Sequence, residues 1–103
     1  YVWDTAIIFI QKCTDKTNYA NKNSLNTSFL STGTTNDNPC NIFDMASNVR
    51  EWTTETSSDS SYPCVRRGGD CNSSDVYTST RGYDDTSGSY SSIGFRPLLY
   101  INV

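Results

Sequence analysis

The chain of 103 residues contains no histidine, and none of its four cysteines stand in the Cys-x-x-Cys spacing. Structural zinc sites are built from these ligands at short spacings, so the sequence argues against one. Basic residues are also few: eight Lys and Arg against eleven Asp and Glu give a net charge of −3. Nucleic-acid binders carry a basic stripe, and anionic membranes attract basic surfaces. We therefore expect neither kind of partner.

Long apolar runs are missing as well. No window approaches the 18 apolar residues that a transmembrane helix needs, so no membrane insertion is expected. The apolar run 6–10 is too short for a span and lacks the flanks of a signal peptide. The length allows a single domain, residues 1–103, with a modest core. Because the chain opens at Tyr1 and already looks like the middle of a domain, we expect it to be the C-terminal part of a longer chain.

The four cysteines, Cys13, Cys40, Cys64 and Cys71, allow three complete disulfide pairings, and the sequence does not choose among them. Disulfides would require an oxidising compartment. Cys13 and Cys64 lie in segments of apolar pattern, so we expect these two to be buried free thiols.

The apolar pattern predicts an α+β fold in which a short helix packs on short antiparallel strands joined by long loops. Trp3, Ala6, Ile7 and Ile10, with Phe9 as a possible addition, fall on one face of a helix over residues 3–13. Residues 14–40 read as a long loop, either ordered or mobile. Alternation and turn signals place the strands, which are predicted at residues 49–56, 64–68, 77–81 and 93–103.

Residues 70–92 consist almost wholly of Ser, Tyr, Asp, Thr and Gly. Tyr offers a large, rigid contact surface and the small polar residues offer adaptable hydrogen bonds, which is the composition of antibody-type binding surfaces. The alternative is a solvated or disordered loop, since Ser/Gly-rich tracts are commonly flexible. The recurrence of Tyr77, Tyr83 and Tyr90 favours the binding surface, and residues such as Trp52 and Phe95 would serve the framework that holds it.

Three framework motifs carry a family resemblance: Asp44-Met-Ala-Ser-Asn-Val-Arg-Glu-Trp-Thr53, Arg67-Gly-Gly69 and Ile93-Gly-Phe-Arg-Pro97. Their order and spacing resemble the C-terminal half of the formylglycine-generating-enzyme (sulfatase-modifying) branch of the C-type lectin-like fold. This chain departs from the pattern at Ser47, where Gly is usual, and at Arg50, where Trp is usual. The loss of that aromatic residue suggests a more open surface at position 50.

The resemblance implies two readings of function. Enzymes of that branch oxidise a substrate cysteine with two closely spaced cysteines after the Arg-Gly-Gly motif, but only Cys71 lies there, so we expect no enzyme and no catalytic residues. The non-enzyme members whose chains end in this way look like the variable proteins of diversity-generating retroelements, which display a diversified patch on a C-type lectin-like scaffold. This reading implies recognition of a protein or cell-surface ligand, a location on a phage particle or bacterial cell surface, and a possible oligomer.

The expected ligand-binding surface draws on the tract and on one residue of the preceding strand. Its candidate residues are Arg66, Asn72, Ser74, Asp75, Tyr77, Thr80, Tyr83, Asp84, Asp85, Ser87, Ser89 and Tyr90. The alternatives are a cysteine oxidase of the formylglycine-generating type and a structural domain of a phage tail or surface assembly.

No cofactor is expected. The resemblance allows a structural calcium ion near Asp44 and Glu51, because oxygen ligands suit calcium. The simpler interpretation, which we favour, is that Asp44 caps a turn and Glu51 pairs with an arginine. Arg67 and Arg96 are then expected to pair with Glu51 or Asp44, since a buried arginine needs a carboxylate partner. The sugar-binding motifs of true lectins are absent, which argues against calcium-dependent sugar recognition.

Overall fold

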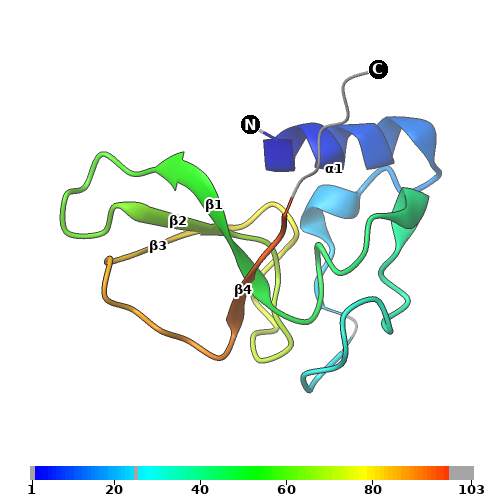
Figure 1. The fold of residues 1–103 in the computed structure, drawn as a ribbon. Helices are drawn as coiled ribbons and strands as arrows, with labels where there is room; N and C mark the ends of the chain where they lie inside the picture. Colours follow the sequence, from blue (N-terminus) through cyan, green and yellow to red (C-terminus); the bar gives the residue numbers. More distant parts are fainter. Residues whose placement is uncertain (1, 25, 98–103) are drawn as a thin grey trace.

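The computed structural model describes residues 2–24 and 26–97, and Figure 1 shows its elements. Helix α1 (Val2–Cys13) is followed by a long connection with two short 3-10 helices, η1 (Tyr19–Asn21) and η2 (Pro39–Asn41). Four strands follow: β1 (Arg50–Thr56), β2 (Cys64–Arg67), β3 (Arg81–Asp84) and β4 (Ile93–Phe95). One short helix, short strands and long connections match the predicted α+β class.

The four strands form one sheet in the order β3-β2-β1-β4. β1 and β2 are antiparallel, as are β2 and β3, but β4 runs parallel to β1. The prediction of a wholly antiparallel sheet is therefore wrong at β4. A tight turn forces neighbouring strands to be antiparallel, but β4 is reached from the opposite edge of the sheet by a crossing loop, so no turn sets its direction.

Two predicted strands differ in extent from those observed. The prediction at residues 77–81 is wrong, because this segment is a turn with a single bridge to Asn23, and β3 begins only at Arg81. The Thr80 N–H bonds the Tyr77 carbonyl and closes the turn. The predicted strand 93–103 is observed over Ile93–Phe95, and its last part, 98–103, lies outside the described residues.

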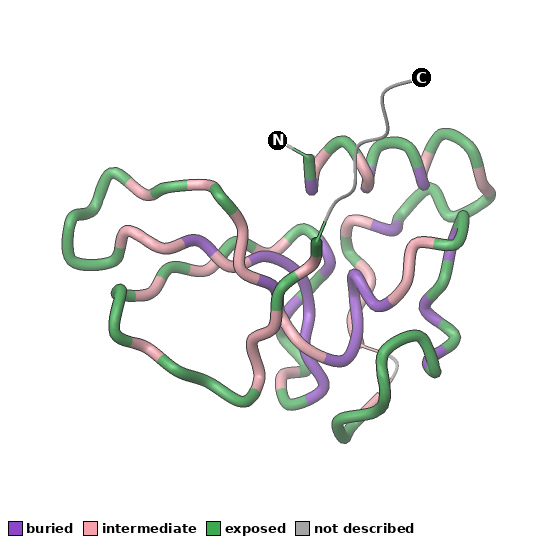
Figure 2. Tube along the Cα trace, viewed as in Figure 1, coloured by how far each residue is buried: buried purple, intermediate pink, exposed green. Residues whose placement is uncertain are grey.

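The core lies between α1 and the segment that precedes β1. Trp3, Ile7 and Ile10 of the helix are buried against Tyr19, Met45 and Ala46, whereas Phe9 is exposed. Figure 2 shows these buried stretches facing one another. In the described residues, α1 meets the sheet at its first turn, where Asp4 binds Arg67 of β2 and Trp3 lies against Gly68, just after that strand. The predicted packing of the helix on the sheet is thus confirmed there, and the rest of the helix packs on residues 44–46 and η1.

The long connection between α1 and β1 contains buried, hydrogen-bonded side chains. Asp37 has no exposed surface. It accepts hydrogen bonds from the Tyr19 hydroxyl and from the Ala46 N–H, both at 2.7 Å. The Lys22 ammonium lies 3.4 Å from the same carboxylate. A buried carboxylate with three donors ties η1 to the turn before β1 and so orders this connection.

All four cysteines are free thiols, but their burial differs from the prediction. Cys13 is exposed, Cys64 is half-buried, and the buried thiol is Cys71. The helix ends at Cys13, beyond the core that Ile10 reaches, so the apolar pattern of the helix does not carry burial to its last residue.

Candidate functional site

The tract of residues 70–92 has three parts: a turn-rich stretch before β3, the edge strand β3 itself, and a loop that crosses to β4 (Figure 1). We call residues 70–80 the anchored segment and residues 85–92 the outer loop. Tyr77, Tyr83 and Tyr90 are 42%, 47% and 45% exposed. The other exposed candidates are Asn72, Ser74, Asp75, Asp85, Ser87 and Ser89, while Arg66, Thr80 and Asp84 are half-buried.

The tract also contains four buried residues: Asp70, Cys71, Val76 and Thr78. Of these, Val76 and Cys71 were visible in the sequence as residues foreign to the Ser/Tyr/Asp/Thr/Gly set. Asp70 and Thr78 carried no such signal, because their residue types match the exposed positions around them.

The first end of the anchored segment is held by an ion pair and by backbone bonds. The Arg50 Nε atom lies 2.5 Å from the Asp70 carboxylate, and both side chains are largely buried. The Asp70 carboxylate also accepts the Asn72 N–H at 2.8 Å. The Cys71 N–H bonds the Asn48 carbonyl at 2.9 Å. Arg50 therefore does not open the surface, as its departure from the family pattern suggested, but fixes the turn that presents residues 72–75.

The second end of the anchored segment is held by Thr78, which is fully buried. Its N–H and its hydroxyl both donate to the Lys22 carbonyl, at 3.0 and 3.2 Å. Its own carbonyl accepts the Trp3 indole N–H at 2.8 Å. The Asn23 side chain donates to the Ser74 carbonyl between these two ends. The backbone beneath Tyr77 is thus bonded to both α1 and the connection after it.

Two of the candidate residues, Arg66 of β2 and Asp84 of β3, form an ion pair across neighbouring strands. The Arg66 Nε atom lies 2.9 Å from the Asp84 carboxylate, and both side chains are largely shielded from solvent. The Arg66 side chain lies over Gly82, where an added Cβ would come within 2.6 Å of Nε. Gly82 leaves the space that this ion pair needs. Tyr83 points to the opposite face of β3 from Asp84, since successive strand residues alternate.

The outer loop is held mainly by local contacts. The Asp85 carboxylate accepts the Ser87 N–H at 2.9 Å and the Ser87 hydroxyl at 3.0 Å. These bonds favour the charged form and lower the pKa of Asp85. The Tyr90 ring lies against Gly88. At its far end, the Arg50 N–H bonds the Ser92 carbonyl at 3.0 Å, where the loop joins β4.

The carboxylates of Asp44 and Glu51 are filled by protein donors. Asp44 accepts the Gly33 N–H at 3.0 Å and the Thr35 hydroxyl. Glu51 accepts two N–H groups of Arg96, at 2.5 and 3.0 Å. Calcium takes six to eight converging oxygen ligands, and these donor-filled carboxylates do not fit such a shell. The pairing of Glu51 with Arg96 is confirmed. The expected turn cap is wrong, because the Asp44 carboxylate binds Gly33 and Thr35 of the preceding connection instead of its own turn.

Arg67 has different partners from those predicted. Its guanidinium is buried and binds Asp4 of α1 and Glu55 of β1, instead of Glu51 or Asp44. Glu51 lies opposite Arg67 in the pairing of β1 with β2, but its carboxylate binds Arg96, and Arg67 binds Glu55 of the same strand. The hydrogen bond from Arg67 lowers the pKa of Asp4. This ion pair holds the start of the helix at the end of β2.

Cys71 is the one cysteine near the position that the family resemblance marks as reactive. It is buried, and its sulfur lies 3.7 Å from the Asn72 side-chain oxygen. Burial, and next the charge of Asp70, raise the pKa of the Cys71 thiol. A nucleophilic cysteine needs an accessible thiol with a lowered pKa, so this environment favours the inert thiol form.

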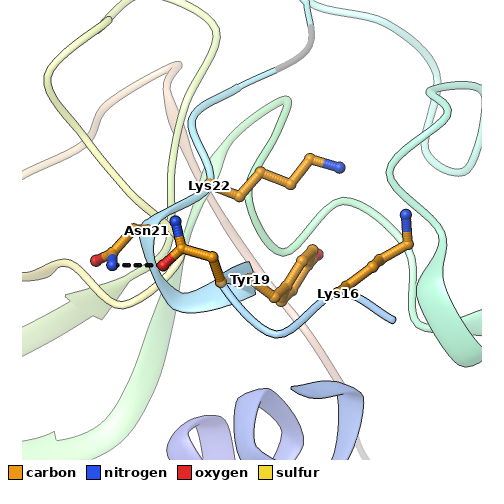
Figure 3. A pocket seen from close by; sticks show the side chains of 5 residues that line it. Lys16, Tyr19, Asn21 and Lys22 are labelled. Atoms are coloured by element: carbon orange, nitrogen blue, oxygen red, sulfur yellow. Dashed lines mark hydrogen bonds between the residues drawn. The ribbon is translucent and has the colours of Figure 1, made fainter. Parts of the chain in front are cut away.

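Two of the concave sites that the described residues form lie outside the tract. The smaller, about 280 Å³, is lined by Lys16, Asn18, Tyr19, Asn21 and Lys22 (Figure 3). Its main polar groups bind within the chain, since Lys22 pairs with Asp37 and Asn21 donates to Asn18.

The larger site, about 880 Å³, lies between the start of α1, residues 41–45 and the strands β1 and β4. Trp3, Ala6, Met45 and Trp52 contribute apolar surface to it, and Phe95 stands at β4. We call it the apolar hollow.

The framework motifs and the fold both agree with the family model that this chain matches. Residues 1–100 match the FGE-sulfatase family, the sulfatase-modifying factor enzyme 1-like domain. The chain belongs to this family. Domains of the FGE-sulfatase family have the C-type lectin-like fold, which confirms the fold class expected from the motifs. Comparison with curated proteins and with solved structures found no match.

Two further findings concern the described part of the FGE-sulfatase domain. Over residues 2–24 and 26–97, no helix has the length and apolar character needed to cross a bilayer. Over the same residues, no three His, Cys, Asp or Glu side chains gather as ligands for a metal ion.

Proposed function

We propose that this FGE-sulfatase domain is a recognition module that binds a protein or cell-surface ligand through residues of the 70–92 tract. The observation that carries the proposal is the split within the tract between exposed and buried positions. Tyrosines and small polar side chains reach solvent, while Asp70, Val76 and Thr78 hold the backbone beneath them. A rigid scaffold that presents tolerant surface positions is the arrangement of antibody loops.

We further propose that the exposed positions are diversified, as in the variable proteins of diversity-generating retroelements. The test is genomic. We expect a reverse-transcriptase gene nearby, with a near-copy of the region that encodes residues 65–97 differing at adenines. The differences should alter exposed positions such as Tyr77 and Tyr90 and spare the codons of Asp70 and Thr78. Absence of both the gene and the near-copy contradicts diversification but leaves ligand binding open.

Ligand binding itself is tested by selection. A library randomised at Tyr77, Tyr83 and Tyr90 and at the exposed polar candidates is displayed and selected against purified surface proteins and whole bacterial cells. We expect folded, specific binders, and Ala at all three tyrosines should abolish binding while the thermal unfolding stays cooperative. If the triple variant unfolds like Trp3→Ala, a variant of the buried core, the tyrosines are core residues and the proposal fails.

The site of action that fits this function is a phage particle or a bacterial cell surface. There the module would act at the tip of an assembly and meet its ligand on another cell. A purely structural role within such an assembly is the competing interpretation. If the triple tyrosine variant loses ligand binding but still assembles normally, the tract serves recognition and not a structural role.

A cysteine-oxidase function is the alternative within the family. The buried Cys71 thiol with its raised pKa favours the non-enzyme interpretation. The assay offers a sulfatase-type cysteine peptide under aerobic conditions and measures formylglycine by mass spectrometry. We expect no conversion, and turnover that Cys71→Ser abolishes would replace the binding proposal with an enzymatic one.

A further inference from the structure

The three lysines of the chain, Lys12, Lys16 and Lys22, all lie in one short stretch. Each of the five arginines pairs with a carboxylate in the part of the chain that the structure describes. Lys12 and Lys16, by contrast, form no ion pair with a described residue. Unpaired positive charge in the described residues therefore gathers in this stretch, although the chain as a whole is acidic.

Two of these lysines line the smaller concave site at η1, which we call the lysine pocket, and buried groups hold one of them in place. The Lys22 ammonium lies 3.4 Å from the Asp37 carboxylate and 5.5 Å from the centre of the Tyr19 ring. Asp37 and Tyr19 are buried and hydrogen-bonded to each other at 2.7 Å. An ammonium has three N–H donors, so one carboxylate contact leaves donors for a ligand. Because Lys22 already has a fixed position, it loses little entropy when a ligand binds.

Lys16 and an asparagine add further donors to the lysine pocket. Figure 3 shows the Lys16 and Lys22 side chains extending in the same direction, with Tyr19 between them. The Asn21 amide donates to the Asn18 side-chain oxygen at 2.8 Å, which leaves the Asn18 amide nitrogen as a donor. Two ammonium groups and an amide nitrogen therefore line one pocket.

The size and the charge of the lysine pocket suit a small anion. Its volume of about 280 Å³ lies just below the usual range of pockets for drug-sized ligands, so it favours a small group. The charges of Lys16 and Lys22 exceed that of the buried Asp37 by one positive charge. Asp15 is exposed beside Lys16 in the sequence but does not line the pocket. An anion bound there meets donors on its own side and has the Asp37 carboxylate behind the Lys22 ammonium.

We infer that the lysine pocket binds a phosphate-type oxyanion, either as the free ion or as the anionic group of a saccharide. Lysine binds phosphate as a point charge, and hydrogen bonds between two charged groups are stronger than those between neutral ones. The oxyanion would take N–H donors from Lys16 and Lys22 and from the Asn18 amide. None of the lining residues belongs to residues 70–92, so the inference does not depend on the proposed function.

Titration of the ¹⁵N-labelled chain with inorganic phosphate, followed by NMR, tests this inference. The ionic strength is held constant with sodium chloride, so that screening does not change during the titration. We expect saturable shifts of the backbone amides of Asn18, Tyr19 and Asn21. Lys16→Gln should weaken phosphate binding at least about tenfold, as loss of a hydrogen bond between charged groups does. Lys16→Arg keeps the charge and should retain most of the affinity.

Lys12→Gln is the matched control, because it removes the same charge from an exposed lysine outside the pocket. Its phosphate affinity should stay close to that of the unmodified chain, and both Gln variants should unfold at an unchanged temperature because both side chains are exposed.

Glucose 1-phosphate separates the two sources of the oxyanion. Tighter binding than that of inorganic phosphate indicates a saccharide-linked group, and weaker binding indicates the free ion. Absence of saturable shifts with both probes overturns the inference. Equal weakening by Lys12→Gln and Lys16→Gln also overturns it, because the attraction would then be general and not that of a pocket.

Discussion

Residues 70–80 and residues 85–92 share a polar, tyrosine-containing composition, but the protein holds them differently. The anchored segment has Asp70 and Thr78 buried and bonded to α1, to the connection after it and to the start of β1. The outer loop has no buried residue, and its side-chain hydrogen bonds run between its own members Asp85 and Ser87. One half is rigid through long-range contacts, and the other is shaped by short-range ones.

This difference separates two roles within one binding surface. A side chain on a pre-organised backbone loses less entropy on binding, so Tyr77 is suited to an anchoring contact. Tyr90 stands on a loop that can adjust to the ligand. Substitutions of exposed side chains should therefore be tolerated in both halves. Insertions and deletions, which change the backbone, should be tolerated only in the outer loop.

The largest loss of stability is expected from Trp3→Ala. This change removes a large core side chain and also the hydrogen bond that holds the anchored segment at Thr78. The ring is 7% exposed and its N–H bonds the Thr78 carbonyl. Truncation of a buried aromatic costs roughly 3–5 kcal/mol. Phe95→Ala, an exposed aromatic, is the matched control and should cost far less. Similar losses in urea unfolding for both variants would contradict the burial of Trp3.

Asp70→Ala tests the ion pair at the first end of the anchored segment. It leaves the largely buried Arg50 guanidinium without its carboxylate, and the loss of one partner of a buried pair costs roughly 3 kcal/mol. Asp85→Ala makes the same chemical change in the outer loop, where the carboxylate is exposed, and should leave the unfolding midpoint unchanged. Equal destabilisation by the two variants would remove the distinction between the halves.

Thr78→Val tests the second end of the anchored segment while preserving shape. It removes the hydroxyl that bonds the Lys22 carbonyl, a bond worth about 1 kcal/mol. The matched control is Thr86→Val in the outer loop, where the side chain is exposed and the expected change lies within ~0.5 kcal/mol. Amide exchange should show the same contrast, with slow exchange at Thr78 and Ser79 and fast exchange at residues 86–89.

The ion pair of Asp4 with Arg67 gives a smaller, pH-dependent effect on the same framework. Because the pKa of Asp4 is lowered below its ordinary value of 3.8, the stabilisation is fully present above that value and is lost as the pH falls through the folded-state pKa. The Asp4 side chain is 48% exposed, so screening limits the effect to less than about 1 kcal/mol. Asp4→Asn should remove this part of the acid sensitivity. Burial raises the pKa of Glu51, so this residue favours the folded state as the pH falls, both in the unmodified chain and in Asp4→Asn. Unfolding curves of the two proteins that stay parallel through the acid range would contradict the prediction.

The smallest effect is expected from Ser87→Ala and Ser89→Ala in the outer loop. Both side chains are exposed, so each change should stay within ~0.5 kcal/mol. A loss as large as that of Asp70→Ala would show that the outer loop is part of the framework.

Local pattern was sufficient to predict several features of this chain. The periodicity of Trp3, Ile7 and Ile10 located helix α1, because burial of one face imposes the helical period on the sequence. Alternation located β1, and the motifs that flank the tract identified the family and its fold. The exposure of the three tyrosines also followed from composition.

Tertiary structure alone decided the features that depend on contacts distant in sequence. The parallel direction of β4, the choice of Asp4 and Glu55 as partners of Arg67, and the burial of Asp70 and Thr78 all depend on where the chain returns in space. In the sequence alone, an aspartate that anchors the tract cannot be told from an aspartate that faces solvent. They differ because Arg50 on β1 lies 2.5 Å from the Asp70 carboxylate, while the partners of Asp85 lie within its own loop.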